Sequence, residues 1–500
     1  MSLGDEVSMK SPARLGRDNR PNILMLFSDQ HNARMAGFMG NTIVQTPSLD
    51  RLAARGVVFD NAYCSSPLCS PSRQSFMAGL YCHHIDMWNN TAAMPEDTVT
   101  WAHMLSLAGY ETSLVGKMHF NGYQKMYGFD RRPVLEGSEA GEHFYSWGLR
   151  TSHVWTDPLP YSSVNPQTFD PTRALLNAGP DSPERLKIFQ KDLEVLDVTC
   201  KMLREKATDK DGRPWAICAS FVLPHPPLRG RADIVERYRG KGDLPFNIRG
   251  EGRDACDQWI LHWHGNMQRA SEEAIRHGRE VYFSLITEFD EYAGRILDCL
   301  AEGGLDANTV VFYFSDHGEM AGEHGMWNKV TLLESSIRAP LIVSWPGHYP
   351  QGARIDTPVS LVDLYPTFLE IAGVSLPPPL TVDGHSLVPL LEGRPQDFAG
   401  SEVFCEFEGE GWNHPRACIR VGEYKYVYNH TADERLYDLE ADPYEMTDLA
   451  TDPRYLSILL QMRARLFRDW DPAGVEKRVL AAQVRRQIAR NKHVCKDLGW

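Results

Sequence analysis

The sequence predicts an α/β protein with a large, mostly parallel central sheet flanked by helices, and with a smaller antiparallel sheet, a helix and a helical tail near the C-terminus. Three observations predict it. Short, largely apolar runs of strand length alternate with amphipathic helical segments, polar side chains follow these runs closely, and period-two alternation replaces this pattern past about residue 395. Strands buried on both faces are continuous apolar runs, which is typical of a parallel sheet covered by helices.

Four apolar runs are predicted to be buried strands: Ile23–Phe27, Thr112–Val115, Ala216–Leu223 and Val310–Phe314. The segments around them show helical spacing. "SLDRLAARG" predicts a helix that stops at Gly56, and "TWAHMLSLAG" predicts one that stops at Gly109, because glycine commonly ends a helix. "REVYFSLITEFDEYAGRILDCLAEGGL" predicts a long amphipathic helix that also ends in glycines.

We expect four regions along the chain. Residues 1–20 form a flexible polar lead, and residues 21–395 form the large α/β domain. Residues 396–470 form a smaller α+β subdomain, because "EVFCEFEGEGWNHPRACIRVGEYKYVYNH" alternates like an antiparallel meander and a helix follows. Residues 471–500 form a basic helical tail. Its apolar residues recur at roughly helical spacing and predict a contact in a homo-oligomer, a dimer or a tetramer: Val479, Leu480, Val484 and Ile488.

Composition disfavours several classes of protein. The chain has 500 residues and a formal net charge of −14, which argues against nucleic acid and anionic membranes as partners, since both need a basic surface. No apolar run reaches the roughly 20 residues that span a bilayer. The N-terminal segment is polar and lacks the apolar core of a secretory signal. The ten cysteines have no C-x-x-C spacing, so we expect free thiols and a bacterial-type cytoplasmic location.

Polar side chains follow each of the four predicted strands where the strand ends: Asp29 and Gln30, Lys117 and His119, His225, and Asp316 and His317. In parallel α/β sheets the ligand binds beyond the carboxyl ends of the strands. Each of these residues alone has an ordinary explanation as a polar loop residue. Together, at equivalent strand ends, they predict one shared site.

The stretch "CSPSR", Cys69 to Arg73, combines a cysteine, a proline and an arginine where a loop is expected to turn into a helix. Pro71 fits the first turn of that helix, because a missing N–H costs nothing there. A helix that begins here would direct its positive end towards an anionic site.

This motif and six other segments resemble, in the same order, the formylglycine-dependent (type I) sulfatases of the alkaline-phosphatase-like superfamily. The segments are "PNILMLFSDQ", "TPSLDRLAARGVVFDNAY", "CSPSRQSFMAGL", "GYETSLVGKMHF", "SFVLPHPP", "FYFSDHGEMAGEHGMWNK" and "LYDLEADPYEMTDLA". Within the family, "SDQ" and "SDHG" favour the bacterial branch that holds choline sulfatases, arylsulfatases and phosphonate monoester hydrolases.

The resemblance implies that a formylglycine-generating maturation enzyme oxidises Cys69 to an aldehyde, and that it recognises Pro71 and Arg73 together with the cysteine. One hydroxyl of the hydrated aldehyde would attack sulfur to form a covalent sulfo-enzyme, and the second would then expel sulfate. The ordinary alternative for Cys69 is a buried free cysteine.

The resemblance also implies a divalent-metal site, in which residue 69 is a further ligand beside four side chains: Asp29, Gln30, Asp316 and His317. Oxygen ligands suit a hard ion such as Ca²⁺ or Mg²⁺, and the imidazole makes Mn²⁺ more plausible. The ordinary alternative for both aspartates is a place in a helix cap or a turn.

Other roles follow from the same resemblance. Arg73 resembles the arginine that holds the formylglycine and a metal-ligand carboxylate. Lys117 is similar to a cation that binds the sulfate, and His119 to a histidine that orients the diol. His225 is similar to a sulfate-binding histidine or the proton donor to the leaving alcohol, and Lys329 to a second cation on the sulfate. The ordinary alternative for Lys329 is a surface lysine, and for the His225 segment it is a loop made rigid by its prolines.

Three further residues are predicted to bind substrate: Trp88, Asn89 and Asn328. An aromatic ring at position 88 would stack on an aryl group, contact a quaternary amine, or simply pack in the core. The neighbouring pair His83 and His84 is expected in a solvent-facing loop, with a place in the pocket wall as the alternative.

Hydrolysis of a small sulfate monoester, aryl or alkyl, is the activity that the resemblance implies first. The same nucleophile and metal would serve a phosphonate monoester or phosphodiester, and promiscuity between the two is expected. A non-catalytic anion-binding relative is the remote alternative. The expected partners are a small anionic ester and the maturation enzyme.

Overall fold

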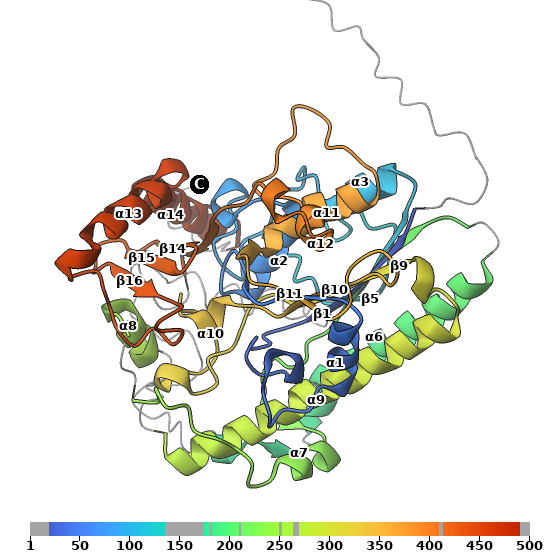
Figure 1. Ribbon diagram of the computed structural model, residues 1–500, viewed down its shortest axis with the longest axis horizontal. Coiled ribbons are helices and arrows are strands. Elements are labelled where there is room, and N and C mark those ends of the chain that lie inside the picture. The colour runs from blue at the N-terminus through green and yellow to red at the C-terminus, as the bar shows by residue number, and fades with distance from the viewer. Residues whose placement is uncertain are drawn as a thin grey trace, which may run out of the picture.

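The predicted fold class is confirmed by a mixed α/β body with one large sheet and a separate antiparallel sheet towards the C-terminus (Figure 1). The structure is a computed structural model that describes residues 20–135, 175–180, 183–209, 212–249, 253–263, 270–409 and 414–490. The flexible lead predicted for residues 1–20 lies almost entirely outside these ranges.

The large sheet has eight strands in the spatial order β11-β2-β10-β9-β1-β7-β4-β5. Of these strands, β10 alone runs antiparallel to its neighbours. The bounds of the eight strands are β1 Asn22–Ser28, β2 Val57–Phe59, β4 Glu111–Gly116, β5 Arg131–Leu135, β7 Trp215–Ser220, β9 Thr309–Ser315, β10 Leu341–Ser344 and β11 Ala353–Ile355. Two small parallel pairs lie outside it: β3 Ala62–Tyr63 with β12 Val359–Ser360, and β6 Gly179–Pro180 with β8 Arg229–Gly230.

All four predicted strands belong to the large sheet, and one of them ends earlier than expected. β7 stops at Ser220, whereas the apolar run continues to Leu223. The physical reason is that a side chain, and not a neighbouring strand, accepts the next main-chain hydrogen bonds. The carboxylate of Asp192 accepts hydrogen bonds of 2.8 Å from the main-chain N–H groups of Val222 and Leu223.

Helices cover both faces of this sheet: α1 Pro47–Ala54, α2 Cys69–Ala78, α3 Trp101–Leu107, α6 Pro183–Thr208, α9 Glu272–Glu302 and α11 Leu364–Ile371. The remaining helices of this region are α7 Ala232–Tyr238, which packs on α9, α8 Ala255–Trp263 and α10 Glu334–Ile337, which lie towards the C-terminal sheet, and α12 Val388–Leu391. Short 3-10 turns connect some of them: η1 Gly37–Met39, η2 Cys82–His84, η4 Asp306–Asn308, η5 Glu323–Gly325, η6 Leu361–Asp363 and η7 Pro395–Asp397.

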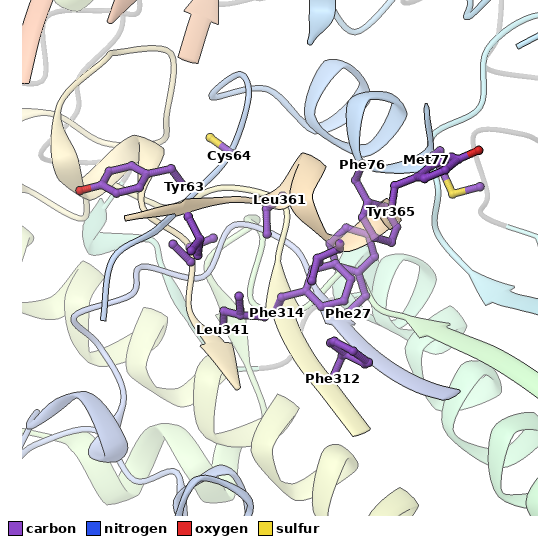
Figure 2. Packing of buried hydrophobic residues seen from close by; sticks show 14 of the residues in the cluster. Phe27, Tyr63, Cys64, Phe76, Met77, Phe312, Phe314, Leu341, Leu361 and Tyr365 are labelled. Carbon is purple, nitrogen blue, oxygen red and sulfur yellow. The ribbon is translucent and has the colours of Figure 1, made fainter. Parts of the chain in front are cut away.

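The two covered faces follow from the alternation of side chains along β1. Odd-numbered apolar residues of β1 point to a layer formed with α2, α3 and α11, and even-numbered ones point to α1, α6 and α9. Figure 2 shows part of the first layer, where Phe27 and Phe314 lie with ring centroids 4.4 Å apart. Phe76 of α2 packs on both rings. The helix that begins at Cys69 is therefore seated firmly on the strands whose ends form the site.

The predicted antiparallel meander near the C-terminus is also confirmed. Its four strands run in sequence order: β13 Val403–Phe407, β14 Arg416–Val421, β15 Tyr424–Asn429 and β16 Arg435–Asp438. The 3-10 turn η8 Pro453–Tyr455 and the helices α13 Leu456–Asp469 and α14 Pro472–Arg490 follow. In α14, Val479 is buried, while Leu480 and Val484 are partly exposed. The side chain of Ile488 lies outside the described residues, and the oligomer contact stays a prediction.

Across the described ranges, no helix combines the length and the apolar character needed to cross a membrane.

Candidate active site

The carboxyl ends of four neighbouring strands meet at one edge of the large sheet. Ser28, which ends β1, lies opposite Ser315 of β9, and Gly116, which ends β4, lies opposite Ser220 of β7. Because these ends are level, the polar residues that follow them come together. The cluster contains every strand-end side chain that the sequence singles out: Asp29, Gln30, Lys117, His119, His225, Asp316 and His317.

Cys69 is the first residue of α2 and is almost completely buried. Its Sγ lies 3.2 Å from Nε2 of His317 and 3.7 Å from Oδ1 of Asp29. Burial by itself raises the pKa of the Cys69 thiol, but the positive charges of Lys117, Lys329 and His317 hold that pKa well below its usual value. Residue 69 therefore lies where negative charge is stabilised.

Arg73 connects the strand ends beneath Cys69. Its guanidinium is fully buried and donates at 2.8 Å to Oδ2 of Asp29 and at 2.7 Å to Oδ2 of Asp316. A second pair of bonds, both 2.9 Å, goes to the main-chain carbonyl of Lys117 and to Oγ of Ser220. Because these contacts occupy all three nitrogens, Arg73 acts as a fixed cross-link between two carboxylates.

Four buried residues offer ligand atoms that all lie within 4.8 Å of one another: Asp29, Cys69, Asp316 and His317. Burial raises the pKa of both carboxyls. Lys117, His225 and Arg73 nevertheless hold the pKa of Asp29 well below its usual value, whereas the pKa of Asp316 stays raised. Two adjacent buried carboxylates beside an imidazole and a thiol fit a divalent cation, since oxygen and nitrogen donors of this kind suit hard or borderline ions.

Gln30 lies beside this group, and its amide is oriented by a residue that sequence reasoning misses. Nε2 of Gln30 donates to Glu319, and its Oε1 accepts from Lys329. Glu319 is buried and also accepts from the main-chain N–H groups of Asn328 at 2.6 Å and Ala321 at 2.9 Å. The sequence signal for Glu319 is its position three residues after Asp316, and that signal alone is weak.

Two lysines and two histidines complete the cluster. Nζ of Lys117 lies 2.6 Å from Oδ2 of Asp29, and Nζ of Lys329 lies 3.0 Å from Nε2 of His225. Both lysines are less than 10% exposed, so Lys329 is not the surface lysine of the ordinary alternative. His119 hydrogen-bonds to Cys69 and lowers the pKa of its thiol. The side chain of His225 is 28% exposed, which leaves it open to an incoming molecule.

Sequence reasoning does not assign a structural role to the residues that hold the start of α2. The main-chain N–H of Ser70 donates to Oδ1 of Asn90 at 3.0 Å. The side chain of Asn121 in turn donates to the carbonyl of Asn90 at 2.9 Å. Asparagines in a loop are too common for the sequence to single out these two.

The three residues predicted to bind substrate occupy different surroundings. Trp88 is fully buried among residues of the C-terminal sheet and its helices, which agrees with the packing alternative. Asn89 is buried, and its Oδ1 accepts from the hydroxyl of Thr91 at 2.8 Å. Asn328 is exposed beside the cluster. Substrate binding by these residues stays a prediction.

The expectation of a solvent-facing loop is wrong for His83. This residue is 6% exposed, and its Nδ1 lies 2.8 Å from Oε1 of Glu406 on β13. His84 is exposed, as expected. The pair lies at the far end of α2 from Cys69 and packs against the C-terminal sheet, because β13 covers the turn that carries it.

The chain is similar to known proteins along most of its length. The model of the sulfatase family matches residues 21–374, and a model of the C-terminal part of N-sulphoglucosamine sulphohydrolase matches residues 322–470. A choline-sulfatase of Rhizobium meliloti is 33% identical over 94% of this chain and 90% of its own length. Arylsulfatase K of Mus musculus is 27% identical over 90% of this chain and 80% of its own length.

A solved structure has the same fold. The phosphonate monoester hydrolase of Agrobacterium radiobacter superposes with a TM-score of 0.69 at 23% identity, covering 92% of this chain and 96% of that one. The family model alone spans well over half of the 500 residues. The chain therefore belongs to the sulfatase family and is a sulfuric ester hydrolase.

Proposed function

We propose that this enzyme hydrolyses a small sulfate monoester, an aryl or alkyl sulfate, to an alcohol and sulfate, with residue 69 as its nucleophile. The observation that carries the proposal is the convergence of Lys117, Lys329 and His317 on the buried Sγ of Cys69. A thiol is a weak hydrogen-bonding group and needs no such surroundings. A pair of hydroxyl groups at the same position would form strong hydrogen bonds with these charged side chains.

The matured residue 69 would carry the formylglycine aldehyde, whose hydrate supplies one hydroxyl to attack sulfur and a second to release the sulfate through a covalent sulfo-enzyme. Conversion by a formylglycine-generating maturation enzyme is part of the proposal. His119, which hydrogen-bonds to residue 69, would orient the hydroxyl that keeps its proton. His317, whose Nε2 lies 3.2 Å from Sγ, would hold the metal beside residue 69.

A divalent cation held by Asp29, Gln30, Asp316, His317 and residue 69 would neutralise charge that develops on the sulfate oxygens. Ca²⁺, Mg²⁺ and Mn²⁺ all suit this donor set. Oε1 of Gln30, which accepts from Lys329, would be the ligand atom that Gln30 offers to the ion.

The remaining side chains have complementary roles. Lys117 and Lys329 would bind the non-bridging oxygens of the ester, because both ammonium groups lie beside residue 69 in a buried setting. His225 would give a proton to the leaving alcohol, since its ring is partly exposed and lies 3.0 Å from Nζ of Lys329. Arg73 would position Asp29 and would not touch the substrate.

The charge of the site favours monoanionic esters. Arg73 is fully engaged by two carboxylates, and Lys117 is shared with Asp29. Few positive charges are left to neutralise a dianion, so a phosphate monoester is the poorer match. A phosphonate monoester and a phosphodiester are monoanions like a sulfate monoester, and hydrolysis of such phosphorus esters is the second candidate function.

A paired assay separates the two candidates. One preparation, whose Cys69 peptide shows the aldehyde by mass spectrometry, is tested with an aryl sulfate and the matching aryl phosphonate. We expect kcat/KM to favour the sulfate by about 100-fold, which corresponds to about 2.7 kcal/mol of transition-state preference. An equal or higher value for the phosphonate would make phosphorus esters the substrates and overturn the proposal.

Replacing Glu319 by glutamine is expected to lower the affinity for the activating metal about 10- to 100-fold, as changes behind a ligand typically do. The glutamine would present an N–H group to the amide of Gln30, which then loses its fixed orientation. Titration of the metal-stripped enzyme with Mn²⁺, followed by activity and by calorimetry, measures the shift.

The matched control is Glu323→Gln. Glu323 is also buried, but it pairs with Arg34 and Ser335 outside the cluster. Its replacement should leave the metal titration unchanged. Equal metal affinities for Glu319→Gln and the wild type would show that Glu319 does not orient a ligand.

A further inference from the structure

The segment that carries Lys329 has a backbone conformation that L-residues rarely adopt. Asn328 has a φ of 67° and Val330 a φ of 76°, both in the left-handed region. Asparagine tolerates this region, but a β-branched valine is a genuine outlier there. Such a conformation persists only where the surrounding structure holds it in place.

The segment is held on its N-terminal side by the active-site cluster. The main-chain N–H of Asn328 donates to Oε1 of Glu319 at 2.6 Å. The carbonyl of Asn328 accepts from the N–H of Met320 at 2.7 Å. This anchor lies within the large domain and fixes the chain up to residue 328.

On the C-terminal side the anchor is a buried charge network that joins the start of α8 to the C-terminal sheet. The hydroxyl of Thr331 donates to Oδ1 of Asp257 at 2.7 Å, and the same oxygen accepts from Arg416 of β14 at 3.0 Å. Arg416 is 1% exposed and is held in turn by Asp254 at 2.8 Å and Asn429 at 2.6 Å. Thr331 is therefore held by Asp257 of α8, and Asp257 is held in turn by Arg416 of β14.

A second contact from the same sheet fixes the next residue. Nζ of Lys425 on β15 is fully buried and donates to the main-chain carbonyl of Leu332 at 2.7 Å. The same ammonium group binds Oε1 of Glu334 at 3.0 Å and pairs with Glu445. In Figure 1, α10, which begins at Glu334, lies between the C-terminal sheet and the large sheet.

The chemistry of these contacts matters as much as their location. Apolar packing is non-directional and would stabilise the C-terminal sheet against the large domain in many slightly different registers. Hydrogen bonds to the Thr331 hydroxyl and the Leu332 carbonyl specify a direction as well as a distance. Between these bonds and Glu319, the two residues Lys329 and Val330 have little freedom.

We propose that the C-terminal sheet positions Lys329 for catalysis, with Arg416 and Lys425 as positioning residues that act through Thr331 and Leu332. The sheet thereby holds the ammonium group of Lys329 against His225 and Gln30. This inference rests on the proposed function, in which Lys329 binds the sulfate ester. It makes the smaller subdomain part of the catalytic apparatus.

Two substitutions of Thr331 test the proposal. Thr331→Val keeps the shape of the side chain and removes the hydroxyl, whereas Thr331→Ser keeps the hydroxyl. We expect Thr331→Val to lower kcat/KM for an aryl sulfate about tenfold, which is the effect of losing one positioning bond, and Thr331→Ser to stay near the wild type. The control is Thr309→Val, whose buried hydroxyl donates to the carbonyl of Leu305 at 2.7 Å, far from the site in the fold; its activity should not change.

A double-mutant cycle with Lys329→Ala separates positioning from a general structural role. If Thr331 acts through Lys329, then adding Thr331→Val to Lys329→Ala should lower kcat/KM no further. An equal tenfold loss in both backgrounds, or full activity of Thr331→Val alone, would overturn the inference. Full activity of Lys329→Ala would instead overturn the proposed role of Lys329, so the two failures are distinguishable.

Discussion

Replacement of Cys69 by alanine is expected to lower kcat for an aryl sulfate by at least about 10⁴-fold, the scale of loss seen when an enzyme's nucleophile is removed. Alanine cannot be converted to an aldehyde, so neither hydroxyl of the hydrate forms. Lys117 and Lys329 are buried in the wild type and are not changed by the substitution, so the variant should still bind a sulfate ester. The measurement is the initial rate of each protein. The wild-type rate is divided by the amount of chain that mass spectrometry shows to be converted to the aldehyde.

Cys82→Ala is the matched control for this experiment. Cys82 is as buried as Cys69, and its Sγ lies 3.2 Å from Oγ of Ser75 at the other end of α2. Its loss removes a buried sulfur without touching the cluster, so turnover should stay within a few-fold of the wild type. If both Cys69→Ala and Cys82→Ala kept wild-type activity, the nucleophile would have to be a group other than residue 69.

Much of the site can be predicted from the sequence because it depends on short-range order. Largely apolar runs of four to eight residues define the buried strands, and the residues that follow must emerge at one edge when the strands are parallel. Asp29, Lys117 and Asp316 are therefore predictable as neighbours from the sequence alone. The register of Ser28 with Ser315 and of Gly116 with Ser220 is what brings them level.

The supporting residues could not be predicted because their partners are distant in the chain. Asp192 ends β7 early by binding two N–H groups about thirty residues away. Glu319 orients an amide 289 positions away. Local periodicity contains no information about such pairs, since a buried carboxylate and a surface one occupy similar sequence patterns.

The same limit explains the segment from His83 to Trp88. A pair of histidines after a helix is typical of a loop, and Trp88 is compatible with a pocket wall or a core. The side chain of Glu406 and the apolar residues of the C-terminal sheet decide the matter by covering this segment. The decisive partner is more than 300 residues away in sequence.

Replacement of Lys425 by methionine is expected to lower the free energy of unfolding at pH 8 by about 3–5 kcal/mol, the usual consequence of removing one partner of a buried ion pair. Lys425 is fully buried between Glu334 and Glu445. Burial would raise the pKa of Glu334, but Lys425, with Arg338 and Arg420, holds it at about 2. Without the ammonium group, two carboxylates share a buried space with too few positive charges.

The loss should depend on pH, with a sign that follows from proton linkage. In the wild type, the depressed pKa of Glu334 contributes stability that is present above the ordinary pKa of 4.5 and is lost as pH falls towards 2. In Lys425→Met, burial and mutual repulsion would raise the pKa of Glu334 above that ordinary value and would raise further the pKa of Glu445, which burial already raises in the wild type. The folded variant then binds protons that the unfolded chain does not, so its deficit should be smaller at pH 5 than at pH 8.

Urea unfolding at the two pH values, followed by tryptophan fluorescence, measures this deficit. The control is Lys201→Met, because that side chain is 75% exposed and lies 4.0 Å from Glu205; such surface pairs contribute about 1 kcal/mol or less. Adding Glu445→Gln to Lys425→Met should recover part of the lost stability, since it removes one of the two uncompensated charges.

Wild-type stability of Lys425→Met at pH 8 would mean that methionine packing replaces the ion pair fully. The role of Lys425 would then be to orient the main-chain carbonyl of Leu332 through its hydrogen bond. In that case Lys425→Met should lower kcat/KM without lowering the free energy of unfolding.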